Sequence, residues 1–236
     1  MARQVRSEAT RRKILSAAIE VFGEVGYAAA TWGTIVQRTG MTKGALYHHF
    51  DSKESLASGI LEEGSDTLFN ALRNVCGSAS PGLENLLHGT FTILEVLTSN
   101  KTVCAAEQLA SVLVGFNEGA SRFYENLIVE MAEQARRAIS EGDLRGDVDP
   151  VMLGESIVGT ILGTRLVSKV LSARDMNGDL SDDFAGRLRQ KWGLLLPGIV
   201  TEVSLPYIQQ FLSREAMRYA PAAVPRDVAE SAAEIG

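Results

Sequence analysis

The chain has few of the residues that form disulfide bonds or structural metal sites. Its 236 residues include two cysteines, Cys76 and Cys104, which stand far apart and outside any Cys-x-x-Cys motif. That usage fits a reducing cytoplasm and argues against a disulfide framework or a zinc site. The chain also lacks a run of the roughly 20 apolar residues that cross a membrane, and no apolar core follows the arginines near its N-terminus. We therefore expect a cytoplasmic protein with no membrane partner.

Catalytic signatures are missing as well. The chain has three histidines, His48, His49 and His88. It contains no nucleophile elbow, phosphate-binding glycine loop, HExxH pair or dinucleotide glycine fingerprint. His88 stands alone in a helical pattern, where a structural role is favoured over a catalytic one. We predict that the protein is not an enzyme, has no catalytic residues, and needs neither a cofactor nor a metal.

Net positive charge is absent overall but present at one end. The formal net charge is −6, yet residues 1–53 contain eight lysines and arginines against four acidic residues. The rest of the chain then holds 15 basic and 25 acidic residues, a balance of −10. A basic N-terminal segment on an acidic body is the distribution expected when one end of a protein meets phosphate groups.

The sequence has no strand-like alternation, and its apolar positions recur with helical spacing. Residues 77–82, 141–150 and 177–179 interrupt that pattern, and Asp149-Pro150 is a good helix start. Pro197 should bend or shorten the helix that contains it. We predict an all-α fold. The expected helices cover about 7–25, a segment between Thr31 and Gly40, a segment from Thr42, a long helix opened by a capping box at 51–54, and then about 83–98, 102–115, 119–140, 151–173, 182–201 and 206–218.

Residues 31–53 are the most informative stretch and are typical of a helix-turn-helix. Gly40 can end the first helix in the left-handed backbone conformation, and Thr42 supplies a hydroxyl that caps the next one. Leu46 and Phe50 lie one turn apart and form an apolar face that docks onto neighbouring helices. The other face of this helix carries a cation, a glycine, a phenol and an imidazole, from Lys43, Gly44, Tyr47 and His48.

That polar face suits a helix laid against phosphates and base edges, so we interpret the segment as a DNA-binding motif. A merely solvated amphipathic helix would require the whole motif spacing to be a coincidence. Trp32 either contacts DNA or belongs to the small hydrophobic core of this segment, and the core position is favoured. Arg3 and Arg6 either reach DNA or form a solvated basic tail. The candidate DNA contacts are Arg3, Arg6, Thr31, Thr42, Lys43, Gly44, Tyr47, His48 and Lys53.

The segment TWGTIVQRTGMTKGALYHHFDSKESL, residues 31–56, strongly resembles the DNA-binding signature of TetR-type transcriptional repressors. Two further segments, MARQ at 1–4 and VGTILGTRLV at 158–167, are similar to the branch of that family that acts as receptors for γ-butyrolactone and butenolide hormones. The resemblance implies a homodimeric repressor that binds a double-stranded, pseudo-palindromic operator and is released by such a hormone, which would control secondary metabolism. The alternatives are release by an antibiotic or another exported compound, and a homologue that has lost lactone binding.

The same resemblance divides the chain into three parts. Residues 1–53 would be the DNA-binding head, residues 54–218 the helical ligand-binding and dimerisation body, and residues 219–236 a disordered tail. The expected helix 151–173 is rich in small residues, and each interior glycine costs roughly 1 kcal/mol against alanine. Close helix packing alone could explain them, as could the close approach of a ligand. In the resemblance this helix lines the effector pocket and also pairs with its copy.

For the effector pocket we predict a mostly apolar cavity with a few placed polar groups. A γ-lactone offers a carbonyl, a ring oxygen and an alkyl tail. We predict that Thr164 forms a direct hydrogen bond to the lactone. The other polar or amphipathic candidates are Gln108, Tyr124 and Trp192, and the apolar candidates are Phe91, Leu109, Val112 and Met131. Each of these could instead be an ordinary core residue.

Overall fold

The computed structural model describes residues 2–77, 79–172 and 184–219, and every regular element in these ranges is a helix. The all-α prediction is therefore confirmed. The helices are α1 (Ala2–Ala29), α2 (Trp32–Thr39), α3 (Lys43–Tyr47), α4 (Lys53–Val75), α5 (Gly82–Ser99), α6 (Lys101–Leu113), α7 (Glu118–Glu141), α8 (Pro150–Ser172), α9 (Phe184–Ile199) and α10 (Leu205–Arg218). The break expected at 177–179 and the tail 220–236 lie outside the described residues.

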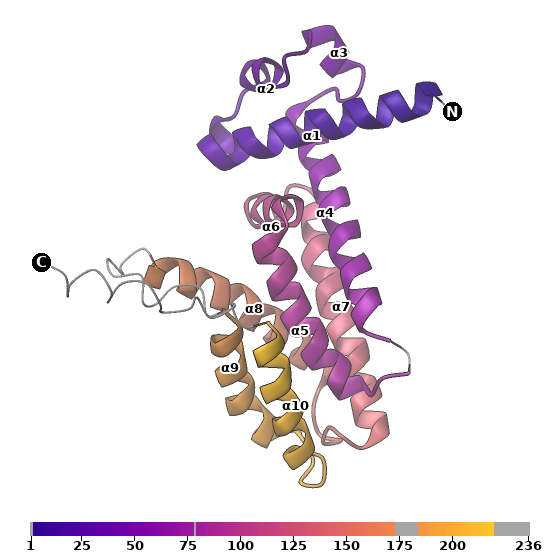
Figure 1. The fold of residues 1–236 in the computed structure, drawn as a ribbon, viewed down its shortest axis with the longest axis vertical. Coiled ribbons are helices and arrows are strands. Elements are labelled where there is room, and N and C mark those ends of the chain that lie inside the picture. The colour runs from indigo at the N-terminus through magenta and orange to yellow at the C-terminus, as the bar shows by residue number, and fades with distance from the viewer. Residues whose placement is uncertain (1, 78, 173–183, 220–236) are drawn as a thin grey trace, which may run out of the picture.

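Helices α1 to α3 form a small head at one end of an elongated molecule (Figure 1). Helix α1 lies across the beginning of the long α4, and α2 and α3 lie on the far side of α1 from the body (Figure 1). A compact core joins these helices because apolar residues from each of them are buried. They include Ile14, Leu15, Ala18, Val21, Phe22, Ile35, Leu46 and Phe50.

The local signals in the head act largely as the sequence predicts. Gly40 ends α2 with φ 64°, and Thr42 Oγ1 accepts a hydrogen bond from the backbone N–H of Ala45 at 3.2 Å. The first helix is longer than predicted, because α1 begins at Ala2 and not near Ser7. Gly26 does interrupt the helical backbone, with φ 78° and ψ 158°, as a stop signal should.

The capping box that opens α4 lies one residue later than predicted. Ser52 is the N-cap, with extended backbone, and its hydroxyl accepts the N–H of Ser55 at 3.0 Å. Ser55 in turn accepts the N–H of Ser52 at 3.2 Å. The predicted pair of Asp51 and Glu54 does not form the box, since the chain turns into the helix at Ser52.

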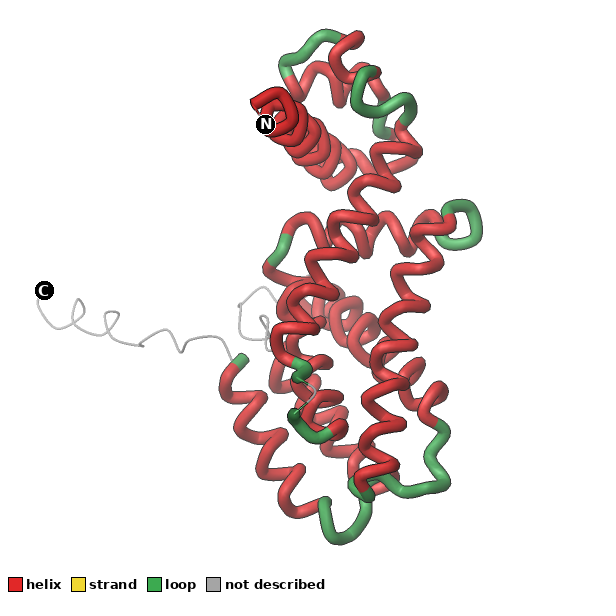
Figure 2. The backbone as a smooth tube through the Cα atoms, turned by 90° about the vertical axis from the view of Figure 1, so that its right-hand side faces the viewer, coloured by secondary structure: helices red, strands yellow, loops and turns green. Residues whose placement is uncertain are grey.

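Helix α4 runs out of the head and into the body, where it packs chiefly against α6 (Figures 1 and 2). The two helices meet at Gly64. A Cβ atom added there would overlap the side chain of Ala106 and would lie 3.2 Å from the carbonyl oxygen of Thr102. A side chain at position 64 would therefore push α4, which carries the head, away from α6.

Helix α8 packs along α7 just as closely. A Cβ atom added at Gly154 would lie 2.7 Å from the carbonyl oxygen of Ile128. Residues 150–168 are long and apolar enough to cross a membrane by length and composition, with a mean hydropathy of 1.3. This single helix is packed against the body and does not indicate a membrane protein. Asp149 caps its start, accepting the N–H of Val151 at 2.8 Å, as the Asp-Pro pair predicts.

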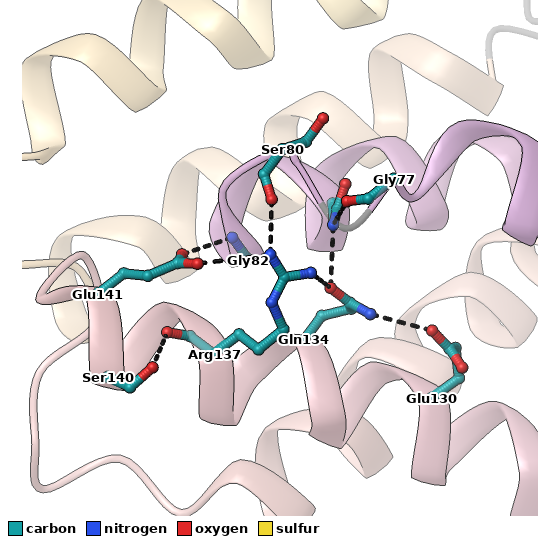
Figure 3. Close-up of polar contacts among 9 residues, drawn as sticks. Gly77, Ser80, Gly82, Glu130, Gln134, Arg137, Ser140 and Glu141 are labelled. Carbon is teal, nitrogen blue, oxygen red and sulfur yellow. Dashed lines mark hydrogen bonds and ion pairs between the residues drawn. The ribbon is translucent and has the colours of Figure 1, made fainter.

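A polar network joins the start of α5 to the end of α7 (Figure 3). The N–H of Gly82 donates to Glu141 Oε2 at 2.6 Å, and Arg137 Nη2 donates to the carbonyl oxygen of Ser80 at 2.8 Å. Gln134 Oε1 accepts from Arg137 Nη1 at 3.1 Å. These bonds tie the loop before α5 to a neighbouring helix and hold Gly82 against its backbone.

We expect Gly82→Ala to lower the free energy of unfolding by about 1–3 kcal/mol. An added Cβ atom would lie 2.6 Å from the backbone nitrogen of Ala138 and 2.7 Å from the carbonyl oxygen of Gln134, and backbone atoms cannot turn aside. Urea unfolding at a fixed protein concentration measures the change. The control is Gly23→Ala, at an exposed helical site with nothing within 4 Å, which should be neutral or mildly stabilising. Equal stability of the two variants would contradict the close contact.

Candidate functional site

Helix α3 presents its polar face to solvent. Leu46 and Phe50 are buried beneath it, while Lys43, Gly44, Tyr47 and His48 are exposed. The structure therefore brings together on one surface the four groups that the sequence predicts to meet DNA. Thr42 is also exposed and caps the helix from the same edge.

Trp32 supports this surface from beneath. It is partly buried against the head core, and its ring lies 5.0 Å from that of Tyr47. Tyr47 remains 48% exposed, and Lys43 Nζ lies 5.7 Å from its ring. The core placement of Trp32 fits the interpretation favoured from the sequence. Its contact with Tyr47 fixes the direction in which the phenol points.

The hydroxyl of Thr31 is used to build the head. It accepts the backbone N–H of Thr34 at 3.2 Å, and Thr34 Oγ1 donates to the carbonyl oxygen of Thr31 at 2.8 Å. Thr31 thus caps α2, and both side chains lie at an exposed helix end. Gln37, about one helical turn after Thr34, is also exposed, and it is not among the DNA contacts predicted from the sequence.

Lys53 is placed differently from the prediction. Its Nζ donates to the carbonyl oxygens of Tyr27 at 2.9 Å and Ala30 at 3.2 Å, and it lies 4.4 Å from the Tyr27 ring. These contacts join the end of α1 to the start of α4 and occupy the ammonium group. In this structure Lys53 closes the head, a role that spacing alone could not reveal, and its contact with DNA stays a prediction.

Several other cations of the head are neutralised by neighbouring carboxylates. Arg38 forms ion pairs with Glu24 at 2.6 Å and Glu20 at 3.1 Å, and these hydrogen bonds raise the pKa of Arg38 above its ordinary value. Arg11 lies 3.7 Å from Glu62 and 3.8 Å from Glu63.

The cations that remain available to phosphate are a smaller set. Within the described ranges, four exposed side chains of the head form no ion pair: Arg6, Arg12, Lys13 and Lys43. The side chain of Arg3 lies outside the described residues. The electrostatic attraction between the described part of the head and DNA phosphates therefore depends mainly on these four side chains.

In the body, the predicted effector residues fall into two groups. Phe91, Leu109, Met131, Thr164 and Trp192 are buried, and Tyr124 is half-buried. Gln108 and Val112 are exposed, with Val112 at 59%, because the outer face of α6 carries both of them. The structure does not place these two side chains in the enclosed interior, and their role in the effector site stays a prediction.

Thr164 has a hydrogen-bond partner that was not predicted from the sequence. Its hydroxyl donates to the carbonyl oxygen of Thr160 at 2.6 Å and accepts from Lys191 Nζ at 2.8 Å. Lys191 belongs to α9 and Thr164 to α8, so this hydrogen bond joins the two helices. Thr164 keeps one lone pair free, but its proton is already committed to the helix backbone.

A buried ion pair next to Thr164 was also not predicted from the sequence. Arg165 Nη1 on α8 donates to Glu107 Oε2 on α6 at 2.6 Å, with side-chain exposures of 6% and 15%. Arg165 Nη2 lies 3.5 Å from Cys104 Sγ. The phenol of Tyr124 donates to the carbonyl oxygen of Glu107 at 3.3 Å, and burial together with the nearby Glu107 carboxylate raises the pKa of Tyr124. The phenol therefore remains a donor at neutral pH.

The outward face of α8 is mostly apolar. Its exposed residues recur at helical spacing and include Met152, Glu155, Ser156, Gly159, Leu166, Val167 and Val170. Leu194 on the neighbouring α9 is 83% exposed. A shallow depression between the two helices is lined by Ser156, Gly159, Thr160, Lys191, Leu194 and Leu195. Such a surface is suited to contact with another protein surface.

Comparison with known proteins agrees with the geometry of the head. The sequence pattern of the family described as "Bacterial regulatory proteins, tetR family" matches residues 14–60. The A-factor receptor protein of Streptomyces griseus is 31% identical over 199 residues, which covers 84% of this chain and 67% of that protein. The chain belongs to the TetR family. Its relatives include HTH-type transcriptional repressors and regulators, which confirms the prediction that this TetR-family chain is not an enzyme.

Solved structures of the same TetR family extend the likeness to the body. A crystal structure of a γ-butyrolactone receptor (ArpA-like protein) is 25% identical, covers 91% of this chain and 99% of that one, and has a TM-score of 0.72. The TetR-family protein CprB of Streptomyces coelicolor, solved in complex with its biological operator sequence, is 27% identical with a TM-score of 0.70. It covers 90% of this chain and 99% of its own.

Proposed function

We propose that this chain is a transcriptional repressor that binds a pseudo-palindromic operator as a homodimer and is released by a γ-butyrolactone or butenolide hormone. The observation that carries the proposal is the exposed face of α3, Lys43 to His48, joined through α4 to a body related to the A-factor receptor. The residues of that face are a cation, a glycine and two aromatic hydrogen-bonding groups, which suit phosphates and base edges.

Two copies are needed to read a palindrome. The heads of a dimer would enter successive major grooves, about 34–36 Å apart. The mostly apolar outward face of α8 and the exposed Leu194 of α9 support pairing of these helices around a two-fold axis. We also propose the domain division into head 1–53, body 54–218 and tail 219–236, and a cytoplasmic location, in which the operator is accessible.

The effector class rests on the relatives. The A-factor receptor and the γ-butyrolactone receptors are named for hormone ligands, and their likeness to this chain includes the body. The sequence also resembles the avenolide receptor within the butenolide branch, so avenolide belongs among the compounds to be tested. Release of DNA would then control secondary metabolism. A multidrug-efflux repressor, SmeT, is 23% identical and shares the fold, so an antibiotic or other exported compound is the alternative effector.

A titration of preformed protein–operator complex tests the proposal. We expect γ-butyrolactones or butenolides to release DNA and antibiotics to leave it bound, as followed by fluorescence anisotropy of labelled operator. Shifting such an equilibrium from nearly all bound to nearly all free requires about 5.5 kcal/mol of differential binding, shared by the two sites of the dimer. Release by an antibiotic in place of any lactone would favour the alternative effector.

Thr164→Ala should leave operator affinity nearly unchanged and raise the hormone concentration needed for release by roughly tenfold, because in the bound state the Thr164 hydroxyl would turn from the Thr160 carbonyl oxygen to donate to the lactone. Thr98→Ala is the matched control. Thr98 also donates to the carbonyl of its own preceding helical turn, at 2.9 Å, but is exposed on α5. An unchanged dose response in Thr164→Ala would remove this residue from the effector site.

A further inference from the structure

Two buried hydrogen-bond donors on one face of α8 lack acceptors. Within the described ranges, neither Arg165 Nε nor Ser168 Oγ forms a hydrogen bond. Arg165 is 5% exposed and Ser168 is 2% exposed, so bulk solvent does not satisfy them. Leaving a buried donor unpaired costs roughly 1–3 kcal/mol, and native proteins seldom leave such groups unmatched.

The two donors are neighbours. Residues three apart on a helix lie on the same face, with their Cβ atoms about 5–6 Å apart. Arg165 uses its Nη1 on Glu107 and its Nη2 on the Cys104 sulfur, which leaves Nε as the donor with no partner in the described structure. A third unpaired donor, Trp192 Nε1, comes from α9, which the bond from Lys191 to Thr164 holds against α8.

The charges on this face of α8 determine which kind of acceptor can bind the two donors. The positive charge of Arg165 is already balanced by Glu107, whose Oε2 lies 2.6 Å from Nη1. A second carboxylate would bring an uncompensated negative charge into a buried site, which is strongly unfavourable. A neutral carbonyl oxygen carries two lone pairs and can accept from two donors without adding charge.

We propose that Arg165 Nε and Ser168 Oγ together bind the carbonyl oxygen of a neutral ester or lactone effector. This inference rests on the proposed function and specifies which polar atoms of the body recognise the hormone. The ion pair to Glu107 positions the guanidinium for that contact. Because Glu107 is on α6, the same contact connects the effector to the helix that meets α4 at Gly64.

The test compares a lactone with its deoxygenated partner, a cyclic ether of the same ring size and alkyl tail. Calorimetry with full-length protein measures both affinities. Wild-type protein should bind the lactone more tightly than the ether. Ser168→Ala should reduce that preference about fivefold to tenfold, and Arg165→Lys, which keeps the positive charge but has no Nε, should reduce it roughly tenfold or more. The affinity for the ether should remain unchanged in both variants.

Two further measurements sharpen the test. The ring-opened hydroxy acid, which carries a carboxylate, should bind wild-type protein more weakly than the lactone; tighter binding would overturn the proposal of a neutral acceptor. Ser156→Ala, on the exposed face of the same helix, is the matched control and should keep the full preference. Retained operator binding by every variant shows that the protein is folded.

The outcomes separate this inference from the proposed function. If the lactone binds and both variants keep the wild-type preference, the two donors serve a buried water or a structural role, and the subsite is overturned while the proposed function stands. If wild-type protein binds no lactone or butenolide, the proposed function fails and the subsite fails with it. A selective loss of carbonyl preference in both variants supports the assignment.

Discussion

Glu107→Ala is expected to lower the free energy of unfolding by roughly 3–5 kcal/mol. The substitution leaves the guanidinium of Arg165, 6% exposed, without its carboxylate partner in the interior of the body. The nearest alternative partner, Cys104 Sγ at 3.5 Å, is a weak acceptor and does not balance the charge. The cost arises from an unpaired buried cation, so it should exceed the effect of losing an ion pair at the surface.

Urea unfolding at a fixed concentration of protomers measures this cost, because the stability of a dimer depends on concentration. The double variant Glu107→Ala/Arg165→Met should recover most of the loss, since it removes the buried charge and keeps apolar volume. Glu133→Ala is the control. It breaks the exposed pair with Arg136 at 2.9 Å and should change stability by less than about 1 kcal/mol. A double variant no more stable than the single one would show that volume, and not charge, dominates.

Lys43→Ala should weaken operator binding by about 60-fold at 0.1 M salt if each head of the dimer loses one phosphate contact. Each such contact contributes about 0.9 to the slope of log affinity against log salt, so two contacts contribute about 1.8. Lys43 is exposed on α3 and forms no ion pair within the described residues, and its ammonium lies 5.7 Å from the Tyr47 ring. The slope should therefore become shallower by about 1.8.

Tyr47→Ala gives a contrasting result. It removes a side chain that is 48% exposed but carries no charge, so affinity should fall while the salt slope stays the same. Lys101→Ala removes an exposed lysine at the start of α6, in the body, and should alter neither quantity. Equal salt slopes for wild type and Lys43→Ala would show that Lys43 does not contact phosphate. Hormone affinity should be unaffected in all three variants.

The sequence predicted the features that depend on neighbours along the chain. Helix ends at Gly40, Thr42 and Asp149 follow from backbone conformation and local hydrogen bonds, and the structure has each of them. The exposed face of α3 was predictable for the same reason. A five-residue helix with two buried apolar positions leaves one direction for its polar side chains.

Partners distant in the sequence were not predictable. Arg165 and Glu107 are separated by 58 positions, and helical periodicity identifies the face of a residue without identifying what lies opposite. The same holds for Lys191 and Thr164, 27 positions apart, and for the contacts that occupy Lys53. The exposed position of Gln108 was not predictable either, because a polar residue in an apolar segment carries no signal of whether it faces inward.

The close contact at Gly64 has a mechanical consequence. Because Gly64 has no side chain, the α4 backbone lies directly against Ala106 of α6, and α4 can tilt about this point more easily than it can slide past Ala106. Eleven residues separate this pivot from the start of α4 at Lys53, a lever arm of about 16 Å. A tilt of about 10° would swing the head by about 3 Å, and two opposed heads by about 6 Å, which is enough to lose the register of two grooves about 34 Å apart.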